Sequence, residues 1–151
     1  MKEVGSNKTL LEDLIEYIDN QEVDEIKIIK GNESDEIELK KYIEKAGAQY
    51  ANIYFIYTRI NDKSEWTLRY IGKSKSGRVK DRLKNHFLGV GKDHGTKSRY
   101  NDVMKELEYG HQLGLKFICI DPDSLRNYFE EELIESFRGK CLWNYKPPAN
   151  K

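Results

Sequence analysis

Four glutamates lie close together late in the sequence: Glu130, Glu131, Glu132 and Glu135. The apolar residues around them have helical spacing, in which each residue advances by about 100°. On that projection Glu130 falls inside the apolar arc, whereas the other three carboxylates fall outside it. A carboxylate that faces a core must be paired, hydrogen-bonded or bound to a metal. Glu130 is therefore the one carboxylate of the four that is aimed inward, and the alternative is a carboxylate at the edge of the arc that reaches solvent.

Two tyrosines occupy stretches that are typical of strands. Residues 52–58 and 67–71 are rich in β-branched and aromatic side chains, and a polar loop separates them. Because side chains alternate across a strand, Tyr54 and Tyr70 can lie next to each other on one face of an antiparallel hairpin. Cross-strand packing of the two rings would by itself explain such a pair.

A basic helix is predicted over residues 77–88. Arg78, Arg82 and His86 follow one another at intervals of four residues, which places them in one stripe beside the apolar face. A guanidinium next to an imidazole suits a phosphate group. For this helix alone, an exposed basic stripe is the simpler interpretation.

Together these segments resemble the GIY-YIG nuclease superfamily. The hallmarks appear in chain order as Asn52-Ile53-Tyr54, Tyr70-Ile71-Gly72, Arg82 with His86 four residues later, Glu130 and Asn144. The resemblance covers residues 52–147, about two-thirds of the chain. Its most specific part is Tyr-Ile-Gly followed by Lys-Ser and then by Arg-Leu-x-x-His-Phe.

The chain departs from the family pattern in four places. Asn52 stands where the first motif has glycine, and the connection between the two tyrosines is longer than usual. A stretched spacing after Gly72 leaves Arg78 as a competitor for the role of Arg82, although His86 follows Arg82 at the family's interval. Asn144 lies further from the glutamate than is typical.

The resemblance implies a metal-dependent endonuclease whose catalytic residues are Tyr54, Tyr70, Arg82, His86, Glu130 and Asn144. It implies one Mg²⁺ or Mn²⁺ ion per site, held by Glu130. Arg82 would bind the phosphate and Tyr54 would act as general base, with a pKa that must fall from about 10. Tyr70 would orient the attacking water or Tyr54. His86 would contact the phosphate or relay a proton, and Asn144 would support the site.

Charge is distributed very unevenly along the chain, although the total is zero. Residues 1–49 carry 7 basic and 13 acidic side chains, and residues 69–105 carry 11 basic and 3 acidic ones. A basic block of this size attracts a polyanion. The expected nucleic-acid-binding residues are Lys73, Lys75, Arg78, Lys80, Lys84, Lys92 and Lys97.

Double-stranded DNA is the expected substrate, and a homodimer is one way to cut both strands. We expect an enzyme of the restriction or phage-defence type. The alternatives are a structure-specific repair nuclease and an inert nucleic-acid-binding module. The P-loop ending suggested by Gly72-Lys73-Ser74 is excluded, because Thr67 stands where that motif needs its first glycine.

The element pattern predicts an α+β fold. From residue 52 the expected order is β-β-α-α-β-α, with further helices at 98–109 and from Ser124 to about Arg138, and a strand at 115–120. This order predicts a small, largely antiparallel three-stranded sheet flanked by helices over residues 50–151.

Residues 1–49 read as an acidic, mainly helical extension. Its expected elements are a helix at 9–20, a short strand near Ile28 and a helix at 34–46, and a hairpin of 26–30 with 36–40 is the alternative. We expect the extension to pack on the nuclease core or to form a dimer contact. No apolar run approaches the roughly 18 residues of a membrane span. The few cysteines and the polar N-terminus favour a cytoplasmic location.

Overall fold

A five-stranded sheet with helices on both faces forms the centre of the computed structural model, which describes residues 2–4, 8–29, 34–89, 98–140 and 142–146. Strands β3 (Ile53–Arg59), β4 (Thr67–Lys73) and β5 (Gln112–Ile120) are antiparallel, with β3 in the middle. The α+β prediction and the hairpin of β3 with β4 are confirmed.

The expected sheet of three strands was wrong, because the N-terminal segment adds two more. Strand β1 (Lys2–Val4) pairs with β5 in parallel, and β2 (Asp24–Ile26) pairs with β5 in the antiparallel sense. Each has only three residues, too few to show an alternating pattern. Both pair with the edge of β5 that is not paired with β3. Their partners are about 90 to 115 positions away in the sequence, since Asp24 pairs with Leu115 and Lys2 with Ile118.

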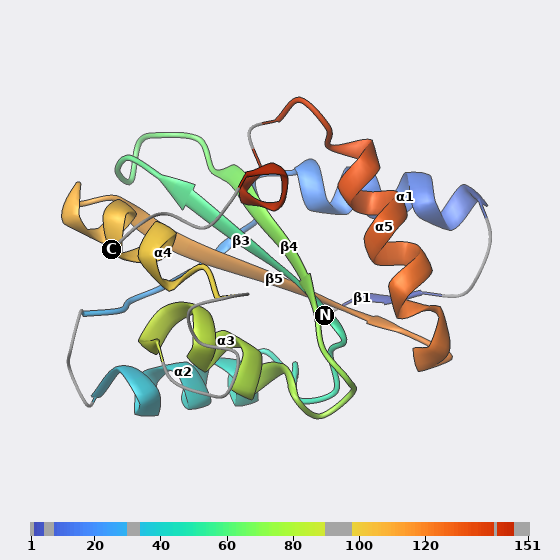
Figure 1. Cartoon of the computed structure of the whole chain (residues 1–151), viewed down its shortest axis with the longest axis horizontal. Helices are drawn as coiled ribbons and strands as arrows, with labels where there is room; N and C mark the ends of the chain where they lie inside the picture. Colours follow the sequence, from blue (N-terminus) through green and yellow to red (C-terminus); the bar gives the residue numbers. More distant parts are fainter. Residues whose placement is uncertain (1, 5–7, 30–33, 90–97, 141, 147–151) are drawn as a thin grey trace.

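Helices cover the two faces of the sheet in separate layers (Figure 1). One layer contains α2 (Ser34–Lys45), α3 (Val79–Leu88) and α4 (Tyr100–Glu108). The other contains α1 (Lys8–Asp19) and α5 (Arg126–Ser136), which follows the short 3₁₀ helix η1 (Asp123–Leu125). The predicted helices are confirmed with ends shifted by a few residues. At α3, Gly89 ends the helix in the left-handed conformation, with φ of 69°.

The segment at 34–46 forms a helix, so the alternative hairpin was wrong. Leu39 and Ile43 are spaced by one helical turn, and both are buried in the layer that contains α3. The Asp35 carboxylate accepts a 2.7 Å hydrogen bond from the backbone N–H of Ile29, which ties the start of α2 to the preceding chain. On the outer surface of this layer, Glu36 pairs with Lys84 of α3 at 2.9 Å.

Residues of the acidic N-terminal segment therefore contribute to the sheet and to both helical layers. Buried Lys116 of β5 fastens α1: its Nζ donates to the carbonyl oxygens of Tyr17 at 2.5 Å and of Asn20 at 3.0 Å. A cation at the C-terminal end of a helix is favourable because the unpaired carbonyls concentrate negative charge there. Among the described residues, no helix is long and apolar enough to cross a membrane.

Candidate active site

Five of the six residues expected to be catalytic come together at the β4 side of the sheet. Tyr54 comes from β3, Tyr70 from β4, Arg82 and His86 from α3, and Glu130 from α5. The Arg82 side chain hydrogen-bonds to both tyrosines, and the Glu130 charge acts on both as well. The site thus lies where the two helical layers meet around β4, which contacts α5 directly.

The two tyrosines and His86 form a compact aromatic group. Ring centroids lie 6.2 Å apart for Tyr54 and Tyr70, 5.6 Å for Tyr54 and His86, and 5.0 Å for Tyr70 and His86. The Tyr54 hydroxyl lies 2.7 Å from Nε2 of His86. The prediction that the tyrosines share one face is confirmed. Tyr57, three residues along β3, points to the other layer and donates to the Ile18 carbonyl at 2.5 Å.

Gly72 makes room for the phenol of Tyr54, which is its cross-strand neighbour. A Cβ at position 72 would lie 2.3 Å from Cζ and 2.4 Å from the hydroxyl oxygen of Tyr54. Any larger residue would therefore displace the hydroxyl. The steric reason for this glycine depends on the register of two strands, so the sequence motif alone did not reveal it.

His86 is fully buried, and both of its ring nitrogens face protein atoms. Nε2 meets the Tyr54 hydroxyl, and Nδ1 lies 3.0 Å from the backbone nitrogen of Arg99. Burial, followed by the charges of Arg82 and Arg99, lowers the pKa of His86 to about 3. The imidazole is neutral at pH 7. Because both ring nitrogens have protein partners, neither is available to a phosphate in this geometry. Of the two roles expected for His86, phosphate contact therefore does not agree with the structure.

Arg82, rather than Arg78, reaches the tyrosines. Its charge and its hydrogen bonds act to lower the pKa of both Tyr54 and Tyr70. Arg78 lies just before α3, has a side chain that is 69% exposed and pairs with Asp81 at 2.9 Å. The preference for Arg82 over Arg78 at the candidate site therefore agrees with the geometry.

Both tyrosines are neutral phenols in this structure. Burial is the main reason that the pKa of Tyr54 rises well above 10, and Tyr70 adds to this while Arg82 opposes it. Burial also raises the pKa of Tyr70, against the charges of Arg82 and Arg99. Tyr54 is completely buried, whereas Tyr70 is partly exposed.

Glu130 is the inward-facing carboxylate of α5, as predicted. Its side chain is 14% exposed, and Glu131 and Glu135 are exposed as expected, but Glu132, which was also expected outside the apolar arc, is partly buried. Burial raises the pKa of Glu130, and the nearby Lys73 opposes this shift. The Lys73 Nζ lies 3.4 Å from Oε1 of Glu130, so this lysine contacts the carboxylate.

The described residues contain no group of three or more His, Cys, Asp or Glu side chains able to hold a metal. A single carboxylate does fit Mg²⁺, which usually keeps several waters and binds one or two carboxylates together with substrate phosphates. Glu130 is partly buried and lies near the cations Lys73 and Arg126, and its carboxylate has the character of such a ligand.

Asn144, in the 3₁₀ helix η2 (Trp143–Tyr145), holds the outer edge of β4. Its Nδ2 donates to the Ile71 carbonyl at 2.8 Å, and its Oδ1 accepts from the Ile71 N–H at 3.0 Å. The amide thus satisfies both backbone groups of the residue after Tyr70, as a neighbouring strand would. Both hydrogen bonds go to the backbone of Ile71, so Asn144 holds β4 in place next to Tyr70 and neither bond reaches the tyrosine or histidine rings.

Asn52 makes the same kind of bracket on the opposite edge of the hairpin, where β3 pairs with β5. Its side chain donates to the Ile120 carbonyl at 2.9 Å and accepts from the Ile120 N–H at 2.7 Å. It also donates to Asp123 at 2.7 Å. Asparagine at this position therefore joins the start of β3 to the end of β5. This role was missed because it depends on a residue 68 positions away.

Arg99 is a further residue at the site that the sequence analysis missed. Its guanidinium lies 5.7 Å from the centre of the Tyr70 ring and donates to Asp102 at 3.4 Å and to the Lys146 carbonyl at 2.9 Å. Only 8% of the residue is exposed. The sequence did contain one indication of this. The helix dipole disfavours a cation just before a helix, so an arginine at that position is expected to bind acceptor groups elsewhere in the protein.

The residues expected to bind nucleic acid separate into two groups. Lys73, at the end of β4, contacts Glu130, and Lys75 and Arg78 are exposed on the connection from β4 to α3. Lys84 faces α2 and pairs with Glu36. Lys92 and Lys97 lie outside the described residues.

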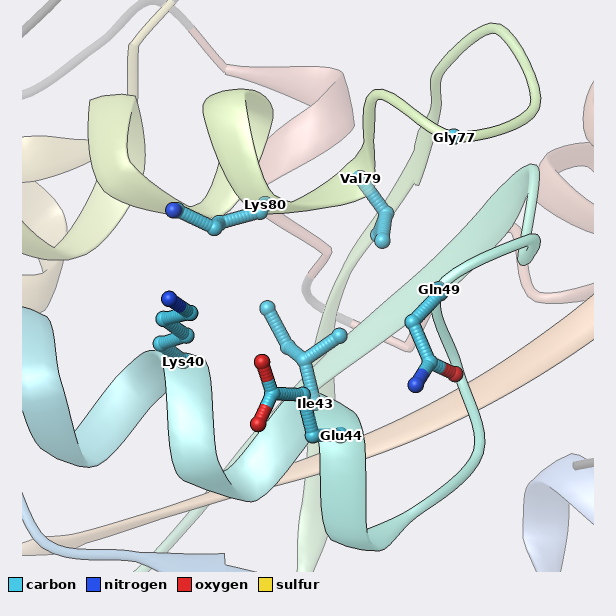
Figure 2. A pocket seen from close by; sticks show the side chains of 7 residues that line it. All are labelled: Lys40, Ile43, Glu44, Gln49, Gly77, Val79 and Lys80. Carbon is cyan, nitrogen blue, oxygen red and sulfur yellow. The ribbon is translucent and has the colours of Figure 1, made fainter.

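Lys80 faces a small pocket between α2 and α3 that is separate from the aromatic group. Figure 2 shows Lys80 and Lys40 of α2 extending into the same space, above Ile43 and Glu44. The pocket encloses about 150 Å³ and shares no lining residue with the candidate site. Lys80 and Lys84 thus face the acidic N-terminal segment rather than Glu130.

Comparison of the chain with protein-family models, curated proteins and solved structures finds no match.

Proposed function

We propose that this protein is a metal-dependent endonuclease that hydrolyses phosphodiester bonds in DNA. The observation that carries this proposal is the convergence of Tyr54, Tyr70, Arg82, His86 and Glu130 from four different elements. In particular, Arg82 acts on both phenols, and the partly buried carboxylate of Glu130 acts on them as well. Packing alone requires no such combination of a base, a phosphate-binding cation and a metal ligand.

Glu130 would hold one Mg²⁺ or Mn²⁺ ion, together with waters and the substrate phosphate. When bound, the ion supplies Lewis-acid polarisation of the phosphate and stabilises charge on the leaving 3′-oxygen. Lys73, which contacts Glu130 at 3.4 Å, would then be free to turn toward a phosphate of the substrate.

Burial keeps Tyr54 a neutral phenol, so it would first have to ionise, with Arg82 and the bound ion lowering its pKa. As its phenolate, Tyr54 would then take a proton from the attacking water. The water oxygen then forms the bond to phosphorus, the bond from phosphorus to the 3′-oxygen breaks, and solvent protonates the leaving oxygen. Arg82 donates charge-assisted hydrogen bonds to the same phosphate, where negative charge develops. Tyr70, the more exposed of the two phenols, orients the water.

Duplex DNA is the proposed substrate, with Lys73, Lys75 and Arg78 contacting backbone phosphates near the site. These contacts position the duplex without reading its sequence. Cleavage of both strands requires two cuts, which a homodimer or two successive encounters would provide. A restriction or phage-defence role is the proposed setting, and a structure-specific repair role is the alternative.

A nucleic-acid-binding module without catalysis is the second candidate. Two observations favour it: Tyr54 is completely buried, and Lys73 contacts the only carboxylate proposed to bind the metal. In a catalyst, substrate or metal binding must rearrange both groups. An inert module would need no such change.

Incubation with supercoiled plasmid, linear duplex, branched DNA and RNA, each with Mg²⁺, Mn²⁺ or EDTA, tests the proposal. We expect metal-dependent nicking and linearisation of the plasmid that is lost in Glu130→Gln. The matched control is Glu131→Gln on the exposed side of α5, which is expected to cleave normally. DNA binding without cleavage by the unaltered chain would support the inert module, and light scattering with and without DNA tests the homodimer.

A further inference from the structure

Two hydrogen bonds determine where the proton of His86 lies. The backbone N–H of Arg99 can only donate, so Nδ1 of His86, at 3.0 Å, must accept and therefore carries no proton. A neutral imidazole has one ring proton, which must then lie on Nε2. Nε2 lies 2.7 Å from the Tyr54 hydroxyl oxygen. In this pair the histidine donates and the tyrosine oxygen accepts.

The doubly protonated form does not fit the same surroundings. A proton on Nδ1 would point at the Arg99 N–H, placing two donors against each other. The charged groups that face the ring, Arg82 and Arg99, are both cations, and the side chain is fully buried. Each of these features disfavours an imidazolium.

The amide of Arg99 is held firmly in position by its neighbours. Ser98 Oγ donates to the Asn85 carbonyl at 2.7 Å, on the residue before His86, and accepts from the N–H of Tyr100 at 3.1 Å. The Arg99 side chain is anchored at Asp102. The start of α4 is thereby fastened to the last turns of α3, with the Arg99 N–H directed at the imidazole.

We propose that His86 is a permanent hydrogen-bond donor to Tyr54, fixed in one tautomer by the backbone amide of Arg99, and that Ser98 and Arg99 are positioning residues for the base. The inference rests on the proposed function where it calls Tyr54 the base. His86 then stabilises the phenolate and takes no proton from the phenol. When Tyr54 ionises, its proton passes to solvent after the rearrangement that its complete burial requires, and the proton count of His86 stays constant through the reaction.

The tautomer can be observed directly in the ¹⁵N-labelled full chain by long-range ¹H–¹⁵N correlation of the histidine rings. We expect His86 to show an unprotonated Nδ1 and a protonated Nε2 at neutral pH. A protonated Nδ1, or an imidazolium, would overturn the inference. This measurement does not depend on cleavage. If the protein fails to cut DNA, the proposed function is contradicted, whereas the tautomer of His86 is still decided by the NMR experiment.

Two substitutions at Arg99 separate its amide from its side chain. Arg99→Ala keeps the N–H, and we expect the His86 tautomer to be unchanged. Arg99→Pro removes the N–H, and we expect the Nδ1 signal to shift as its hydrogen bond is lost. Circular dichroism establishes whether the proline variant is folded. If Arg99→Ala alters the tautomer, the side chain rather than the amide fixes it, and the proposal is wrong.

Substitutions at His86 test the direction of the bond to Tyr54. Gln can still donate an N–H to the phenol but cannot accept a proton, whereas Ala can do neither. We expect His86→Gln to retain cleavage within roughly tenfold and His86→Ala to lose about 10²-fold or more, the scale of an acid–base contribution. We also expect the pH–rate profile of His86→Gln to keep the shape of the parent profile. Equal losses for Gln and Ala would overturn the proposal, because a retained N–H donor would then make no difference to cleavage.

Discussion

At the scale of single residues, a comparison of Tyr54 with Tyr57 distinguishes a hydroxyl with a proposed chemical role from one with a structural role. Tyr54 and Tyr57 are both buried on β3, but their hydroxyls contact His86 in one layer and the Ile18 carbonyl in the other. Removal of either hydroxyl leaves the ring in place; it deletes the hydrogen bonds to His86 and Arg82 in Tyr54 and the hydrogen bond to Ile18 in Tyr57. The pair therefore forms a matched comparison.

We expect Tyr54→Phe to lower the cleavage rate by roughly 10²–10⁴-fold, the contribution typical of a general base. Tyr57→Phe should lower stability by about 1 kcal/mol and leave cleavage nearly normal. Rates measured with Mg²⁺ over a range of pH check this, and residual activity of Tyr54→Phe should rise with pH because hydroxide replaces the base. Near-normal cleavage by Tyr54→Phe would move the base to Tyr70, the more exposed phenol.

The two arginines of the α3 stripe provide a second comparison at this scale. Arg82 acts on both tyrosines, whereas Arg78 is exposed and pairs with Asp81. We expect Arg82→Ala to cost on the order of 3–4 kcal/mol of transition-state stabilisation and Arg78→Ala far less. Single-turnover rates at saturating DNA measure the difference. Similar losses for both would indicate a general electrostatic contribution to DNA binding.

At the scale of elements, the β3–β4 hairpin can hold the Tyr54 ring in its position only because residue 72 is glycine. Gly72→Ala would place a methyl group 2.4 Å from the Tyr54 hydroxyl oxygen, on a backbone that cannot give way easily because Asn144 brackets Ile71 next to it. We expect this variant to break the bond from Tyr54 to His86 and to lose activity while keeping most of its secondary structure. Histidine NMR and the melting temperature report on the site and the fold separately. Full activity of Gly72→Ala would show that the hydroxyl has no fixed position in catalysis.

Periodic elements were predictable from the sequence because their signal is local. The inward register of Glu130 on α5 followed from helical geometry, and the shared face of Tyr54 and Tyr70 followed from the alternation of side chains along a strand. Pairings between distant segments were not predictable. The bracket of Asn144 on Ile71, the amide of Arg99 on His86 and the addition of β1 to β5 each depend on where another part of the chain lies. No alternation or spacing within one segment contains that information.

At the scale of the whole molecule, buried neutral His86 couples stability to pH. Its pKa is about 3 in the folded chain and about 6.5 in an unfolded one. Between these values the unfolded chain binds a proton that the folded chain does not, so the free energy of unfolding decreases as pH falls. The contribution of His86 is fully present above about pH 6.5 and is lost progressively toward pH 3.

The difference between the parent chain and His86→Gln isolates this effect, because other groups titrate in the same range. Burial raises the pKa of Glu130, for example, and its contribution therefore has the opposite sign. We expect the parent chain to lose on the order of 4–5 kcal/mol more than the variant between pH 7 and pH 3. Urea unfolding at several pH values measures this. Parallel curves for the two proteins would mean that His86 is not held neutral.

The position of β5 has a consequence for how the molecule reaches its folded state. This strand pairs with β1, β2 and β3, and the registers join Lys2 to Ile118, Asp24 to Leu115 and Ile53 to Ile118. Each pairing closes a long loop, whose entropy is lost before the contacts are gained. Chains dominated by such non-local pairings fold in milliseconds to seconds rather than microseconds. The complete candidate site likewise requires a distant segment, because Glu130 joins Tyr54 and His86 only when α5 has packed against β4.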